Sequence, residues 1–192
     1  MDATEELFDR RRFHEITLDD VVKAAGVGKG TVYRYFDNKD DLFFQTAVSG
    51  FEDLHDLLRR TVAPGEPFDR QLLTVCRKVS GFFEKRRPLF RMMQSQAMRV
   101  RWQDESVRKR WQAGRRKLLA AVTEIVSRGV AEGKVRSDIP AETLAHFLLG
   151  MLRAQSGEMS GMPRGRRGHQ LLVNLFCNGA ALSRKETAAS KR

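Results

Sequence analysis

The stretch AAGVGKGTVYRYF, residues 24–36, contains the residue types of a phosphate-binding loop. Its Gly28-Lys29 pair resembles the end of the motif G-x-x-x-x-G-K-[ST], in which glycines let backbone N–H groups close around phosphates. The spacing does not fit, because position 23, where the first glycine belongs, is Lys23, and Gly30 stands where the hydroxyl residue is required. A nucleotide-binding enzyme is therefore a minor alternative.

Side chains suited to catalysis or metal binding are sparse. No histidine is followed by a metal-ligand partner at i+3 or i+4, and no cysteine or serine has an evident paired base. The histidines are His14, His55, His146 and His169. We expect Cys76 and Cys177 to be buried as small apolar residues. The sequence therefore predicts no enzyme, no metal and no cofactor.

The same stretch suits two short helices joined by a turn. The apolar residues of 18–25 follow the spacing of one helix face. Thr17 is placed to cap this helix in a near capping box. Gly26 supplies the tight turn, and Val27 is expected to pin it to the core. A second helix over 28–36 would turn hydrogen-bond donors and a glycine outward, which suits the major groove of DNA.

Residues 3–43 resemble the N-terminal domain of TetR-family transcriptional regulators, and AAGVGKGTVYRYFDNKDDLF carries most of the resemblance. It implies a homodimeric repressor that leaves its pseudo-palindromic operator in double-stranded DNA when a small-molecule effector binds. Residues matching those that face bases or nearby phosphates are Lys29, Gly30, Thr31 and Arg34. Residues matching those that mainly contact the DNA backbone are Thr17, Tyr33, Tyr35 and Lys39. The alternative is a helical interaction protein that dimerises without binding an operator.

The whole chain is expected to be all-α, with about nine helices. Its 192 residues are 41% apolar, and alternating β-branched runs are lacking. The expected domains are a three-helix DNA-binding domain over 1–46, a helical effector-binding and dimerisation domain over 47–185, and a flexible tail over 186–192. No stretch approaches about 20 apolar residues, and the acidic start MDATEELF is unlike a signal peptide. We therefore expect a cytoplasmic protein without a membrane partner.

Six helical segments are expected beyond the first domain. They cover about 39–61, 68–86, 88–100, 105–132, 140–155 and 169–183. The resemblance implies that the last two pair with their copies as a four-helix bundle. The expected interface residues are Leu148, Leu152, Leu172, Leu175, Phe176 and Gly179. The alternative is that these apolar stripes close the core of the single chain.

The effector pocket is expected among the helices between residues 68 and 155. Its candidate lining residues are aromatic or methionine: Phe82, Phe83, Met93, Trp102, Trp111, Phe147 and Met151. Such residues at helical spacing more often form plain core than a ligand pocket.

Charge is distributed unevenly along the chain. The total is +11, yet residues 1–46 hold 7 basic against 10 acidic residues. Residues 85–117 hold 12 basic residues against only Asp104 and Glu105. Geometry rather than net charge must therefore support DNA binding. The basic segment has three interpretations: a solvated face, a site for an acidic effector, or an extra nucleic-acid contact.

Overall fold

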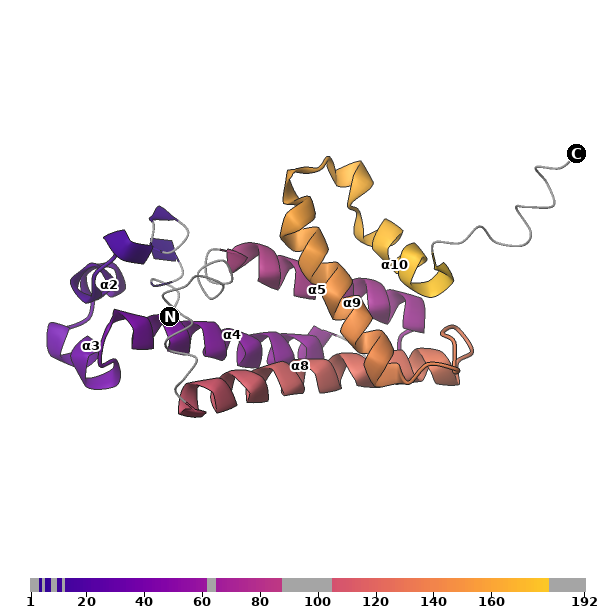
Figure 1. Ribbon diagram of the computed structural model, residues 1–192, viewed down its shortest axis with the longest axis horizontal. Coiled ribbons are helices and arrows are strands. Elements are labelled where there is room, and N and C mark those ends of the chain that lie inside the picture. Colours follow the sequence, from indigo (N-terminus) through magenta and orange to yellow (C-terminus); the bar gives the residue numbers. More distant parts are fainter. Residues whose placement is uncertain are drawn as a thin grey trace, which may run out of the picture. The chain divides into compact units, whose positions relative to one another are not determined.

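The computed structural model describes residues 13–61, 65–87 and 105–179, with Thr4, Glu6, Leu7, Arg10 and Arg11. These residues form helices and turns without a strand, which confirms the all-α prediction (Figure 1). They contain seven α-helices, fewer than the nine or so expected for the chain. The segment expected over 88–100 and the tail lie outside the described residues.

The described elements follow the predicted segments closely. They are η1 (Phe13–Glu15), α2 (Leu18–Ala25), α3 (Lys29–Tyr35), α4 (Lys39–Thr61), α5 (Phe68–Lys85), α8 (Glu105–Ala131), α9 (Ala141–Ser156), η2 (Glu158–Gly161), η3 (Arg164–Arg166) and α10 (His169–Asn178). Two compact units divide the chain: residues 1–57 with 81–118 form unit 1, and residues 58–80 with 119–192 form unit 2. None of the described helices is long and apolar enough to cross a membrane.

Helix α2 begins with a complete capping box. The Asp20 backbone N–H donates to the Thr17 hydroxyl oxygen at 3.1 Å, and the Thr17 backbone N–H donates to the Asp20 carboxylate at 2.8 Å. Two of the N–H groups left unpaired at a helix start are thereby satisfied. The near capping box expected from the sequence is therefore a full one.

A left-handed glycine joins α2 to α3. Gly26 has φ 64°, a conformation that side chains with a Cβ seldom adopt. Its N–H donates to the Lys23 carbonyl, and the N–H of Val27 donates to the Val22 carbonyl, so the reversed chain closes the end of α2. Val27 is 41% exposed, and the expectation that it pins the turn to the core is wrong. The two backbone hydrogen bonds hold this turn instead.

One apolar cluster supports the helix-turn-helix within unit 1. Its buried members come from the segment before α2, from α2, α3 and the first turns of α4: Ile16, Leu18, Val21, Val32, Leu42, Phe43 and Phe44. Fully burying a side chain of this size contributes about 1.5–3 kcal/mol. The helices α2 and α3 lie side by side on this cluster (Figure 1).

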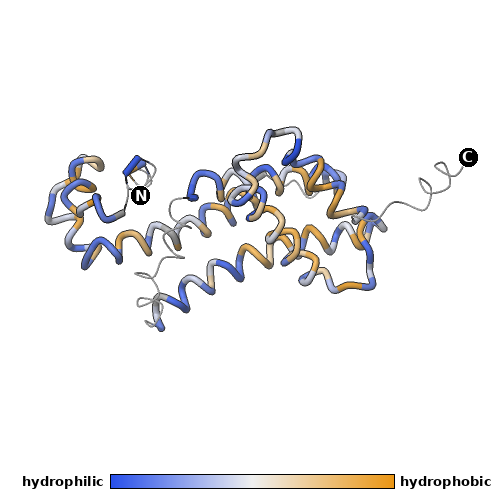
Figure 2. The backbone as a smooth tube through the Cα atoms, turned by 45° about the horizontal axis from the view of Figure 1, so that its top comes forward, coloured by the Kyte–Doolittle hydropathy of each residue, from blue (hydrophilic) through white to orange (hydrophobic). Residues whose placement is uncertain are grey.

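The long helices carry the apolar stripes that the sequence predicts (Figure 2). In α4, Asn38 caps the first turn by accepting the Asp41 N–H at 2.9 Å. Within unit 1, Gly114 of α8 lies so close to Phe51 that a Cβ added at Gly114 would be 3.0 Å from the Phe51 Cβ. Phe51 packs edge-on against Trp111, with ring centroids 4.6 Å apart.

Unit 2 contains a buried polar network that joins α5 to α9. The Ser80 hydroxyl donates to the Gln155 side-chain oxygen at 2.8 Å, and the Ser156 hydroxyl lies 3.3 Å from the Ser80 carbonyl oxygen. The Gln155 amide donates in turn to the Arg167 carbonyl oxygen, which fastens the turn after η3. All three side chains are at most 4% exposed. Neighbouring residues on α5, Leu72, Val75 and Val79, are buried as the periodicity predicts.

The last described helix is shorter than expected. It ends at Asn178 rather than near residue 183, because Gly179 has φ 73° and ψ −176°, which leaves the helical conformation. Between the helical segments expected over 140–155 and 169–183, the chain forms the two 3-10 turns η2 and η3.

The capping box makes the stability of unit 1 depend on pH. Hydrogen bonds from the Thr17 hydroxyl and backbone lower the pKa of the Asp20 carboxyl to about 2. Because the folded state favours the carboxylate, its stabilisation is complete above the unfolded pKa of about 3.9 and is lost as pH falls through about 2. We predict that Asp20→Asn melts at a lower temperature than the parent at neutral pH, and that this deficit shrinks from about pH 4 to about pH 2.

Thermal melting followed by circular dichroism measures the effect. Asp37→Asn is the control, because Asp37 is exposed and lies outside the capping box. A deficit of Asp20→Asn that stays constant down to about pH 2 would contradict the role of the Asp20 carboxylate.

Candidate nucleic-acid interface

Helix α3 presents most of the predicted DNA contacts to solvent. Val32 is 5% exposed and faces the apolar cluster, and this fixes the rotation of the helix. Lys29, Gly30, Thr31 and Arg34 are exposed, and Tyr33 and Tyr35 are 46% and 61% exposed. Thr17 stands at the start of α2, and Lys39 is half-buried at the start of α4. The eight residues thus lie at the N-termini of α2, α3 and α4 and along the exposed face of α3.

The phosphate-binding loop interpretation does not fit this geometry. Such a loop follows a buried strand, whereas residues 18–25 form a helix. Gly28 is the N-cap of α3, and Lys29 is its first helical residue.

Gly30 is a glycine that the free protein does not need for packing. An added Cβ at this position would meet no atom within 4 Å, and Gly30 is not among the glycines with positive φ. Glycine in a helix costs about 0.5–1 kcal/mol relative to alanine. Because Gly30 has no side chain, another molecule can approach the backbone of α3 more closely at this position. The glycine brings no stability to the isolated chain.

Asp19 joins α2 to α3 through two of the predicted contact residues. The Lys29 ammonium donates to Asp19 Oδ2 at 2.9 Å, and the Tyr33 hydroxyl donates to Asp19 Oδ1 at 3.3 Å. The hydrogen bond from Lys29 lowers the pKa of the Asp19 carboxyl, and the carboxylate raises the pKa of Lys29. Lys29 also lies 5.4 Å from the centroid of the Tyr33 ring. We refer to these three residues as the Asp19 cluster.

Arg34 has a different partner. Its guanidinium carbon lies 5.1 Å from the centroid of the Tyr35 ring, and a long hydrogen bond of 3.5 Å reaches the Tyr35 hydroxyl. Among the described residues no carboxylate is paired with Arg34. The five N–H donors of the guanidinium can therefore turn toward a base edge or a phosphate.

Gln45 links the end of α3 to α4. Its amide donates to the Tyr35 carbonyl oxygen at 3.4 Å and to the Asp41 carboxylate at 3.1 Å. Neither Asp19 nor Gln45 was expected as part of this surface, because Asp19 contacts Lys29 and Gln45 contacts Tyr35 across ten residues of sequence. Only the turn at Gly26 could have signalled that α2 and α3 place Asp19 near Lys29.

The basic segment is only partly described. Arg86, directly after α5, pairs with Asp53 at 3.5 Å, and its guanidinium carbon lies 4.6 Å from the centroid of the Phe82 ring, within unit 1. The Arg86 side chain is 12% exposed, so Arg86 contributes to the packing of unit 1 and is not part of a solvated face. The arginines at positions 91, 99 and 101 lie outside the described residues.

The described residues expected to line an effector pocket are divided between the two units. Within unit 1, Phe82 and Phe83 lie edge to face at 5.5 Å, and Phe82 and Trp111 both pack on Phe51. In unit 2, Phe147 is 63% exposed and Met151 is half-buried on α9. Met93 and Trp102 lie outside the described residues.

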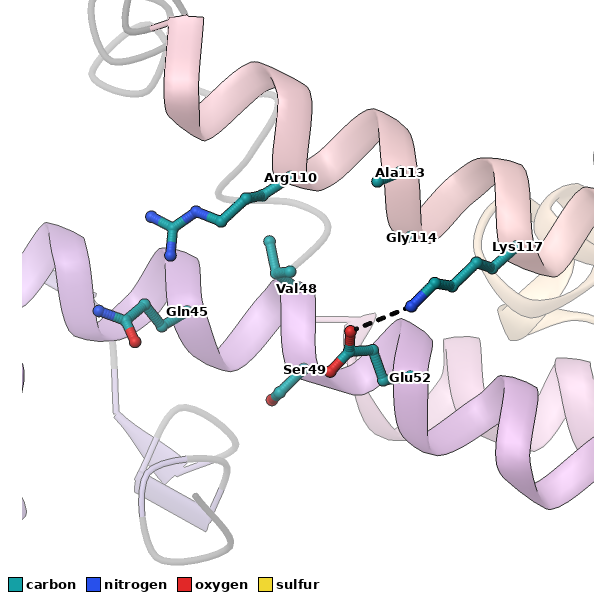
Figure 3. Close-up of a pocket in the computed structure, with 8 residues that line it drawn as sticks. All are labelled: Gln45, Val48, Ser49, Glu52, Arg110, Ala113, Gly114 and Lys117. Atoms are coloured by element: carbon teal, nitrogen blue, oxygen red, sulfur yellow. Dashed lines mark hydrogen bonds and ion pairs between the residues drawn. The ribbon is translucent and has the colours of Figure 1, made fainter.

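A groove of about 300 Å³ lies between α4 and α8 in unit 1 (Figure 3). Arg110 and Lys117 extend from α8, and Gln45, Ser49 and Glu52 come from α4. Lys117 pairs with Glu52 at 3.4 Å, whereas the guanidinium of Arg110 lies 5.8 Å from the Phe44 ring. None of the predicted effector residues lines this groove.

The residues expected at a dimer interface divide into two sets. Leu148, Leu152 and Leu172 are at most 6% exposed in the single chain, so they belong to its own core. Leu175 is 43% exposed, and Phe176 and Gly179 are half-buried and exposed. The stripe thus closes the core with one edge and leaves the other edge in solvent. The exposed apolar side chains on α9 and α10 are Phe147, Leu171 and Leu175.

Sequence comparisons support the N-terminal assignment. The model of the tetR family of bacterial regulatory proteins matches residues 1–46. An uncharacterized HTH-type transcriptional regulator, YhgD of Bacillus subtilis, is 31% identical over 68 residues, which are 35% of this chain and 36% of YhgD. The regulator Rv1255c of Mycobacterium tuberculosis is 43% identical over 42 residues, 22% of this chain and 21% of that protein. The chain thus matches roughly a third or less of the length of these relatives.

Solved structures share the fold over nearly the full chain. FadR from Bacillus subtilis, in complex with stearoyl-CoA, has a TM-score of 0.73 at 16% identity and covers 94% of this chain and 97% of its own. FadR from Bacillus halodurans has a TM-score of 0.75 at 17% identity, over 95% and 94%. Residues 1–46 therefore form a helix-turn-helix domain of the tetR family of bacterial regulatory proteins, and the chain has the fold of these regulators.

Proposed function

We propose that the protein is a homodimeric, sequence-specific DNA-binding transcriptional regulator, a repressor that a small-molecule effector releases from its operator. The observation that carries the proposal is the outward face of α3. Buried Val32 fixes the helix so that Gly30, Thr31 and Arg34 face solvent together. A helix with this low, donor-rich face fits the major groove, where base edges can be read.

We propose that the effector binds the helical part that follows the first domain. Lys117 is paired with Glu52 across the groove between α4 and α8, whereas the Arg110 guanidinium lies over the Phe44 ring. The positive charge of Arg110 suits an effector with an anionic group. The stearoyl-CoA bound to FadR, a protein of the same fold, has such a group. Acyl-CoAs are therefore the first compounds to test for release of DNA.

The dimer is proposed to form through the exposed apolar edge of α9 and α10. Two-fold symmetry of the protein would match the two half-sites of an operator. Phe147, Leu171 and Leu175 are 63%, 53% and 43% exposed in the single chain, and a partner copy would cover them.

Arg34 is expected to read a base, and Lys39 to hold a phosphate. Arg34→Ala should weaken operator binding by about 1–3 kcal/mol and relax the preference at one position of each half-site. Lys39→Ala should weaken binding to all sequences alike and lower the slope of log K against log salt by about one. Binding is measured on sequences selected from random duplexes, with Arg59→Ala as the control. Equal, sequence-independent losses from both changes would show that Arg34 contacts only phosphate.

Gly30→Ala separates function from stability. Because an added Cβ meets no atom and alanine favours the helix by up to about 1 kcal/mol, the variant should melt at an equal or higher temperature. Its affinity for operator DNA should fall, because the methyl group holds α3 away from the bases. Gly81→Ala in α5, where an added Cβ also meets nothing, should share the stabilisation without the loss of binding. An unchanged affinity of Gly30→Ala would show that DNA does not approach this position.

Leu175→Glu tests the dimer. A charge in an apolar interface loses its hydration, so the variant should sediment as a folded monomer and bind a two-half-site operator much more weakly. Leu57→Glu is the control, because Leu57 is also exposed, at 37%, but lies on α4. A folded Leu175→Glu variant that remains dimeric would place the interface elsewhere.

A further inference from the structure

The Asp19 cluster is an ion pair on the very surface proposed to bind DNA. Its carboxylate accepts hydrogen bonds from Lys29 and Tyr33, which are both candidate contacts to DNA. The side chains of Lys29 and Asp19 are 63% and 49% exposed, so solvent and DNA can reach both. The Asp19 oxygens thus hold the two donors as the oxygens of a phosphate would.

The cluster favours an electrostatic role over a structural one. The fold of α2 already has its capping box at Thr17 and Asp20, and the turn is closed by the backbone hydrogen bonds around Gly26. Asp19 is not needed for either. An exposed ion pair is also weak, since water and salt screen it. A DNA phosphate can therefore replace the Asp19 carboxylate as the partner of Lys29, but the free energy of the Asp19–Lys29 pair is lost in the exchange.

Arg34 lacks such an internal competitor among the described residues, because it lies against Tyr35. The competition thus concerns the lysine at the start of α3 and leaves the arginine in its middle available. Phosphate contacts are made on any DNA sequence, whereas base contacts distinguish sequences. A competitor for Lys29 should accordingly change affinity in general and leave the preferred sequence unchanged.

We propose that Asp19 is an internal counter-ion that competes with DNA phosphates for Lys29 and Tyr33, and thereby limits the affinity of the protein for DNA of any sequence. The inference rests on the proposed function, because it requires that this surface meets DNA. Residues 1–46 already carry more acidic than basic residues. Asp19 adds to this general repulsion a specific contact that phosphate must replace.

The test is a double-substitution cycle in the full-length protein. Asp19→Asn should raise the affinity for a random-sequence duplex roughly two- to fivefold at low salt, within the range for an exposed pair. It should steepen the slope of log K against log salt by up to about one, because Lys29 then neutralises a further phosphate. The affinity for the selected operator should rise by the same factor.

Two controls separate the pair from the change in net charge. Asp37→Asn removes one charge from an exposed aspartate of the same domain that is not paired with Lys29. In a Lys29→Gln background, Asp19→Asn should raise affinity no more than Asp37→Asn does. Asparagine has nearly the size of aspartate at this exposed position, and melting curves confirm that each variant is folded.

The outcomes are distinct. If Asp19→Asn weakens binding, Asp19 positions Lys29 for DNA and does not compete. If Asp19→Asn and Asp37→Asn have equal effects, or if the effect persists in the Lys29→Gln background, the pair has no role of its own. A parent protein that binds no duplex at any salt concentration would overturn the proposed function itself. In that case NMR titration of Asp19 would still show whether Lys29→Gln raises the carboxyl pKa toward its ordinary value.

Discussion

The angle between α2 and α3 depends on one backbone conformation. Gly26 at φ 64° reverses the chain within two residues, and its hydrogen bonds fix where α3 begins. Val32 then enters the apolar cluster, and the opposite face of α3 is necessarily the one in solvent. A residue with a Cβ at this turn would meet the strain of the left-handed region. The whole proposed reading surface thus depends on a turn that lies outside the residues proposed to contact DNA.

The first domain combines an acidic composition with a surface of donors. This combination is consistent because net charge and local geometry act over different distances. Charges farther apart than a Debye length of about 8–10 Å are largely screened at physiological salt. Hydrogen-bond donors act at contact, where Arg34 and Thr31 are exposed. Such a domain gains little from long-range attraction and relies on close complementarity.

Local sequence signals predicted the helices of the described residues well. Caps and periodicity act within one turn, so Thr17 and the apolar spacing located α2, α4 and α5 to within a residue or two. The end of α10 was missed, because a glycine can continue a helix or end it, and Gly179 ends it. Val27 was misjudged for a related reason: backbone hydrogen bonds already hold the turn that its side chain was expected to hold.

Contacts between distant residues could not be predicted from the sequence. An apolar stripe shows which face of a helix is buried, but it does not show whether the cover is the same chain or a second copy. Leu148 and Phe147 are adjacent in sequence, yet one is 0% and the other 63% exposed. The ion pair of Asp19 with Lys29 and the hydrogen bond from Ser80 to Gln155 likewise depend on how the helices cross. Of these polar contacts, the one between Asp19 and Lys29 changes the charge of the candidate site.

The network of Ser80, Gln155 and Ser156 also limits how unit 2 can rearrange. Each of its buried hydrogen bonds contributes only about 1 kcal/mol, but a buried polar group left without a partner costs about 1–3 kcal/mol. Sliding α9 along α5 by a fraction of a turn would break both hydrogen bonds that join the two helices, from Ser80 to Gln155 and from Ser156 to the Ser80 carbonyl oxygen. Small displacements are therefore penalised more steeply than an apolar contact would penalise them. A ligand that shifted α9 along α5 would therefore have to break these two hydrogen bonds and supply new partners for their groups, so the shift would be a step between two bonded arrangements rather than a gradual movement.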